Sequence, residues 1–100
     1  MSSDESHDRL VVRNSEILDA ARDDQKILFH PVAGLYCDLD EVATRVWDLM
    51  GESRTLEDLV SSLMAKYPVD RDTCLRDTLA FLTILADKGF ISLQPVQPRS

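Results

Sequence analysis

The residues of this sequence best suited to chemistry are two cysteines, Cys37 and Cys74, and two histidines, His7 and His30. The cysteines form no CxxC pair, and neither histidine stands at a metal-ligand spacing from them. The sequence therefore predicts no metal site and no cofactor. One cysteine falls on an expected strand and the other on an expected helix, so we expect small apolar side chains in the core rather than a disulfide.

Nucleophilic catalysis and nucleotide binding also lack a motif. The sequence contains no Ser/His/Asp or Cys/His arrangement and no pair of acids placed for acid–base catalysis. Its glycines, Gly34, Gly51 and Gly89, are isolated from one another, which excludes a glycine-rich phosphate loop. His30 stands at the end of an expected strand and is predicted to be structural. We therefore expect a protein that is not an enzyme.

Composition indicates a small globular protein with an acidic surface. The chain has 100 residues, of which 44% are hydrophobic and 29% charged, and its net charge is 11 − 18 = −7. This charge disfavours nucleic acids and anionic membranes as partners. No apolar run approaches the roughly 20 residues that a membrane-spanning helix needs. The polar start of the sequence predicts no signal peptide, so we expect a cytoplasmic protein.

The pattern along the chain predicts one domain at residues 10–94, with polar tails at residues 1–9 and 95–100. Short apolar runs at residues 10–12, 16–21 and 26–30 precede a further strand at 35–39. We expect two or three antiparallel strands in this part of the chain, and we predict three. Alternation in the strand at 35–39 separates two sets of side chains, namely Leu35, Cys37 and Leu39 on one face and Tyr36 and Asp38 on the other.

Helical signals begin after residue 39. Asp40, Thr55 and Asp70 are good N-caps, and they predict helices that end near Gly51, Tyr67 and Lys88. Residues 90–93 are expected to form a short final strand. An extended first half, three helices and a last strand indicate an α+β domain of the winged helix-turn-helix type, in which three antiparallel N-terminal strands pack on three helices.

The third helix, at residues 71–88, has an unusually wide apolar side. Its apolar or neutral residues cover an arc of about 220°, against about 100° for an ordinary surface helix. Either strands of the same domain cover the extra surface, or a groove beside the helix receives an apolar ligand or peptide. The helix has three basic and three acidic residues and no Asn or Gln, which argues against its lying in a DNA groove.

The sequence from Gly34 to Leu93 resembles the PqqD-like family, the stand-alone precursor-peptide recognition proteins of ribosomal peptide pathways. The resemblance covers about 60 residues and rests on the order and spacing of several segments. These segments are Gly34-Leu35-Tyr36-Cys37-Asp38-Leu39-Asp40-Glu41-Val42-Ala43, Val46-Trp47, Arg54-Thr55-Leu56-Glu57-Asp58-Leu59, Tyr67-Pro68-Val69-Asp70, Asp77 with Phe81, Leu82 and Leu85, and Gly89-Phe90-Ile91.

The resemblance implies a non-catalytic protein that binds the leader segment of a precursor peptide. The leader would add as a strand beside residues 35–39 and lie along the third helix. The core peptide would then be presented to a maturation enzyme, which is a leader peptidase in lasso-peptide pathways and a radical SAM enzyme in PQQ synthesis. The segment at residues 67–70 favours the lasso-peptide type, with the PQQ type next.

The residues predicted to contact the peptide come from this strand and this helix. They are Leu35, Tyr36, Cys37 and Asp38 on the strand, and Cys74, Asp77, Thr78, Phe81 and Leu85 on the helix. Each of them has an alternative role in the core or on the solvated surface, and Tyr36 could face either way. Trp47 is expected in the core. Two other functions stay open: a winged-helix DNA-binding regulator, and an adaptor subunit that binds a folded enzyme.

Overall fold

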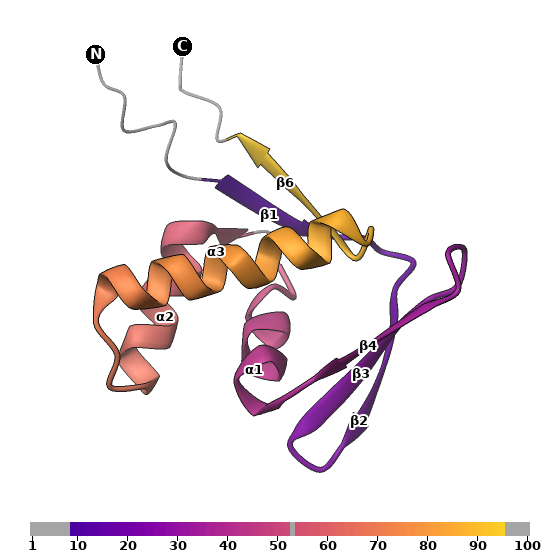
Figure 1. The fold of residues 1–100 in the computed structure, drawn as a ribbon, viewed down its shortest axis with the longest axis horizontal. Helices are drawn as coiled ribbons and strands as arrows, with labels where there is room; N and C mark the ends of the chain where they lie inside the picture. The colour runs from indigo at the N-terminus through magenta and orange to yellow at the C-terminus, as the bar shows by residue number, and fades with distance from the viewer. Residues whose placement is uncertain (1–8, 53, 96–100) are drawn as a thin grey trace.

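The computed structural model describes residues 9–52 and 54–95. The predicted tails fall almost wholly outside these residues, but Arg9 and Pro95 belong to strands. Two sheets and three helices make up the described part of the chain, as Figure 1 shows. In chain order the elements are β1 (Arg9–Arg13), β2 (Leu18–Arg22), β3 (Gln25–His30), β4 (Leu35–Leu39), α1 (Glu41–Leu49), β5 (Arg54–Thr55), α2 (Leu56–Lys66), α3 (Arg71–Asp87) and β6 (Ile91–Pro95).

The first sheet is the antiparallel meander β2–β3–β4, and the helices lie to one side of it (Figure 1). Its three strands are those expected to pack on three helices, so the predicted α+β class is confirmed. The hairpin connection between β3 and β4 needs a residue with positive φ, which Gly34 supplies at +70°. The winged helix-turn-helix arrangement within this class stays a prediction.

The second sheet has the order β5–β1–β6, and it was not anticipated. Four strands therefore precede α1 in the described chain, where two or three were expected, because β1 leaves the meander and pairs with the last strand. Asn14 fixes this arrangement. Its main-chain N–H donates to the Phe90 carbonyl at 3.0 Å, and its side-chain amide donates to the Gly89 carbonyl at 3.0 Å.

The three helices begin at the predicted caps. The side chains of Asp40, Thr55 and Asp70 accept hydrogen bonds from the main-chain N–H three residues further on, which satisfies one unpaired donor of each first turn. The bond from Thr73 also holds the pKa of the Asp70 carboxyl below its usual range. None of the helices in the described chain is both long and apolar enough to cross a bilayer.

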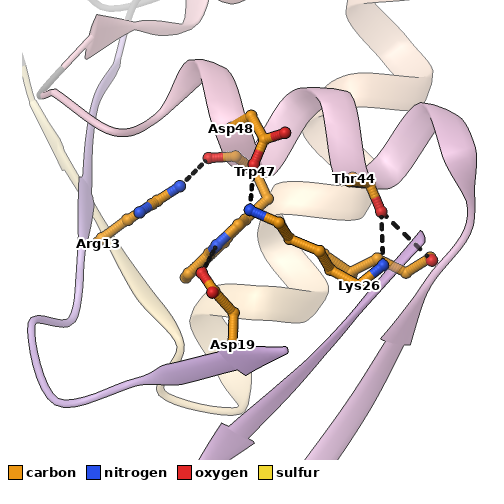
Figure 2. Close-up of polar contacts among 7 residues, drawn as sticks. Arg13, Asp19, Lys26, Thr44, Trp47 and Asp48 are labelled. Carbon is orange, nitrogen blue, oxygen red and sulfur yellow. Dashed lines mark hydrogen bonds and ion pairs between the residues drawn. The ribbon is translucent and has the colours of Figure 1, made fainter. Parts of the chain in front are cut away.

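Trp47 joins the two sheets through α1 (Figure 2). Its side chain is only 1% exposed, which confirms its predicted place in the core. The indole N–H donates to the Asp19 carboxylate of β2 at 3.0 Å. From the other side, the Arg13 guanidinium of β1 lies 4.2 Å from the ring centre and donates to the Trp47 carbonyl. Strands of both sheets are therefore held on the same helix.

The wide apolar side of α3 is covered over part of its arc. Cys74, Thr78, Leu82 and Leu85 are buried, because α3 packs on α2 and β6. Ile84 lies outside this contact and is 51% exposed. The domain's own elements thus cover part of the extra apolar surface, and the flank of α3 toward α1 lines a pocket.

Candidate functional site: a free strand edge beside an apolar pocket

β4 is an edge strand of the meander, so one of its two sides carries main-chain groups with no partner strand. The pairing of β3 with β4 sets which residues these are. Opposite residues of an antiparallel pair alternate between facing each other with their main-chain groups and facing away. The orientation of one pair, Lys26–Leu39, therefore determines the orientation of all the others.

Thr44 shows that the main-chain groups of Lys26 and Leu39 face each other. Its hydroxyl accepts from the Lys26 N–H at 3.0 Å and donates to the Leu39 carbonyl at 3.4 Å, so it occupies the last rung of the β3–β4 ladder (Figure 2). At the opposite end, the His30 carbonyl accepts from the Gly34 N–H at 2.7 Å, across the hairpin. Alternation between these ends turns the N–H and C=O groups of Tyr36 and Asp38 toward the free edge.

An apolar pocket lies just beyond the end of β4, between the first turns of α1 and the middle of α3. Its volume is about 210 Å³. Val42, Ala43 and Val46 line it from α1, Leu63 lines it from α2, and the remaining lining residues are Asp40, Asp77, Thr78 and Phe81. Because Asp40 lines the pocket and directly follows β4, the pocket adjoins the end of this strand.

β2 is the other edge of the meander, but its surroundings differ. The cavity beside the β2–β3 turn has a volume of about 310 Å³ and is lined mainly by charged and polar side chains, including Asp23, Asp24, Glu41 and Asp48. No group of three or more His, Cys, Asp or Glu side chains within residues 9–52 and 54–95 is placed to hold a metal ion. The cavity beside the β2–β3 turn is therefore mainly polar, whereas the pocket at the end of β4 is mainly apolar.

The structure places the predicted strand residues on two faces, as the alternation predicts. Leu35 and Cys37 point to the side of the sheet that faces α1, together with the buried Leu39. Tyr36 and Asp38 point to the opposite face, where Tyr36 is 71% exposed. The Tyr36 ring therefore does not join the core, and it lies 4.6 Å from the Phe29 ring of the neighbouring strand.

The predicted helix residues divide into those that line the pocket and those that do not. Asp77, Thr78 and Phe81 line it, and Phe81 is half-buried. Cys74 and Leu85 lie in the core and line none of it, so contact with a peptide would require the core to open there. Peptide contact by each of these five residues stays a prediction.

Neither cysteine is part of a disulfide. Cys74 is buried, and its thiol lies 4.0 Å from the Val60 carbonyl. Cys37 is half-buried, and burial raises the pKa of its thiol, an effect that the nearby Lys88 opposes and Asp38 adds to. Burial thus disfavours the thiolate, which is the nucleophilic form of this side chain.

Sequence reasoning missed the α1 wall of the pocket. Val42 was not among the residues predicted to contact the peptide, yet it is 48% exposed and lines the pocket. A signal was present, since Val42 and Val46 are four residues apart and Asp40 caps the same turn. The periodicity places these side chains on one face, but it does not show that α3 passes at a distance that leaves a pocket.

The sequence matches a known family and several curated proteins. Residues 25–91 match the profile of a family described as coenzyme PQQ synthesis protein D (PqqD). A PqqA binding protein of Bradyrhizobium diazoefficiens is 42% identical over 53 residues, which are 53% of this chain and 52% of that protein. A PqqA binding protein of Rhodopseudomonas palustris is 38% identical over the same shares. The chain thus spans about half the length of the curated relatives it matches.

Two solved structures resemble the fold over most of its length. TbiB1 in complex with the TbiA(beta) leader peptide superposes with a TM-score of 0.75 and 36% identity, over 81% of this chain and 94% of that one. Lasso peptide synthetase B1 complexed with the leader peptide superposes with a TM-score of 0.69 and 26% identity, over 81% and 95% of the two chains. Both similar structures hold a leader peptide.

Proposed function

Because the chain belongs to the PqqD family, we propose that it is a non-catalytic protein that binds the leader segment of a ribosomally made precursor peptide. The observation that carries the proposal is the free edge of β4 beside an apolar pocket. The leader-peptide complexes of the two similar structures support it.

In the proposed complex the leader adds to the meander as a fourth strand along β4. Its main chain exchanges hydrogen bonds with Tyr36 and Asp38, whose N–H and C=O groups face the free edge. These bonds hold any extended peptide, so they supply affinity without selecting a sequence. The Thr44 hydroxyl bonds to main-chain groups of Lys26 and Leu39 and so holds the end of β4 against β3. A strand that is already held in place loses less conformational entropy when a peptide binds.

Selection of one leader over another falls to side chains. An apolar side chain of the leader that fills the pocket contacts Phe81 and Val46 and displaces water from their surface. Asp40 and Asp77 at the same pocket favour a donor or a basic group nearby on the leader. The net charge of −7 acts in the same direction at longer range and speeds the encounter with a basic peptide.

The bound leader then presents the core peptide to a maturation enzyme. We place this enzyme first in the lasso-peptide class, as a leader peptidase, because both similar solved structures are leader-peptide complexes and one of them is named a lasso peptide synthetase B1. The radical SAM enzyme of PQQ synthesis is the next candidate, since the family profile and the curated relatives carry PQQ-related names.

A titration tests the proposal. A fluorescent leader peptide from the precursor gene beside this protein's gene is titrated with the full chain, and its anisotropy should report micromolar or tighter binding. A scrambled peptide of the same composition is the control, because it keeps the charge and removes the side-chain order. Equal affinity for both peptides, or no binding to either, would overturn the proposal.

A further inference from the structure

The face of the meander that points away from α1 carries a partly exposed apolar strip. Side chains of directly opposed residues point to the same face, so the pairs Leu18–Phe29 and Phe29–Tyr36 form one row across three strands. Ala20 and Ile27 adjoin it in the next row, which Asp38 completes. We define these five apolar residues, Leu18, Ala20, Ile27, Phe29 and Tyr36, as the outer strip.

The fold does not use the outer strip to build its core. The core side of the same strands holds Leu28 and Leu39, both buried, whereas Leu18 of the outer strip is 59% exposed. The Tyr36 and Phe29 rings contact each other but leave most of Tyr36 in solvent. A continuous apolar row of this kind across three strands marks an interaction surface.

Charge around the outer strip favours a basic partner over a second copy. Asp38 lies on the same face, Asp23 and Asp24 form the adjoining turn, and Arg22 is the basic residue among these neighbours. Two copies stacked through this face would bring these acids together and would add to the repulsion between two chains of net charge −7. A partner with an apolar patch bordered by Lys and Arg has the opposite effect.

We propose that the outer strip docks the maturation enzyme, through an apolar patch of that enzyme bordered by basic residues. This inference rests on the proposed function, because its second support is continuity with the leader strand. A peptide added beside β4 extends the same face, and every second side chain of the peptide points to the side of Tyr36. The enzyme then contacts the domain and the bound leader at once, while the pocket on the opposite side stays free for the leader.

The test compares two matched variants of the full chain. Leu18→Asp places a charge in the outer strip on β2, away from the β4 edge. Ile84→Asp makes the same kind of change at a similarly exposed site on α3. Each variant is titrated with the fluorescent leader and, separately, with the leader peptidase or radical SAM enzyme encoded beside this protein's gene. Circular dichroism melts confirm that both variants fold.

We expect Leu18→Asp to weaken enzyme binding at least tenfold and to leave leader affinity within twofold, with Ile84→Asp changing neither. Wild-type binding to the enzyme should also weaken as salt is raised. Unchanged enzyme affinity in Leu18→Asp, or equal losses in both variants, would refute the docking surface. If wild type binds the enzyme but no leader, the proposed function fails, and the inference fails with it. A wild-type dimer in sedimentation that Leu18→Asp dissociates without affecting enzyme binding would assign the strip to a second copy instead.

Discussion

Replacing Asp38 with proline removes one outward-facing main-chain donor from β4 and changes little else in the fold. The Asp38 N–H points to the free edge, so the β3–β4 ladder does not use it. Proline is tolerated in edge strands on the side that faces solvent, and Cys37 before it is already extended, as a residue before proline must be. Asp38→Ala is the matched control, since it removes the same carboxylate and keeps the N–H.

The expected loss follows from the bond that disappears. A main-chain hydrogen bond contributes about 0.5–1.5 kcal/mol net, and a carbonyl of the leader left buried without a donor costs about 1–3 kcal/mol. The proline ring also occupies space at the edge where the leader's main chain would lie. We therefore expect Asp38→Pro to weaken leader binding by about 1–3 kcal/mol relative to Asp38→Ala, which is roughly 5- to 150-fold in Kd.

The assay is anisotropy of a labelled leader with wild type, Asp38→Ala and Asp38→Pro, together with thermal melts of all three proteins. The melts are needed because a proline that unfolded β4 would weaken binding for a trivial reason. Equal affinities of the two variants, with equal melting temperatures, would refute the assignment of the Asp38 N–H to the leader.

Three further predictions concern other parts of the site and its frame. Phe81→Ala should weaken leader binding by about 1–3 kcal/mol in the same anisotropy assay, whereas Ile84→Ala should not change it. Gly89→Ala should lower stability by about 1–3 kcal/mol in a denaturant melt, because Gly89 has a φ of +84° and an added Cβ would lie 3.0 Å from the His30 ring; an unchanged midpoint would show that the backbone relaxes there. In a Cys74→Ala background, alkylation of Cys37 should reach its half-maximal rate at a higher pH than a cysteine in a short peptide, because burial raises its pKa. The raised pKa of Cys37 contributes stability that is present below the ordinary thiol pKa and is lost as the pH rises through the pKa of the folded protein. If the pH of half-maximal alkylation were at or below that of the peptide cysteine, the raised pKa would be contradicted.

Local sequence patterns were sufficient to predict the strand and the helices that form the site. Strict alternation over Leu35–Leu39 predicted both faces of β4, and the caps Asp40 and Asp70 predicted where α1 and α3 begin. These features depend on residues within one or two turns of each other, so the sequence contains all the information that they require. Trp47 in the core was predictable for a similar reason, because the area of an indole outweighs other choices on an apolar helix face.

Long-range packing decided what the sequence could not predict. β1 pairs with β6 at the far end of the chain, and the Asn14 bonds that fix this pairing have no sequence signature. The same limit applies to α3. Its wide apolar arc is visible in the sequence, but only the positions of α2 and β6 determine that Leu85 faces the core while Phe81 reaches a pocket.

The most direct test of leader addition to β4 is amide hydrogen exchange, measured residue by residue with and without a saturating leader peptide. The account predicts that the Tyr36 and Asp38 amides exchange rapidly in the free protein and become protected in the complex, while the β2 amides do not change. Protection along β2, or bound leader with no slowing at Tyr36 and Asp38, would contradict it.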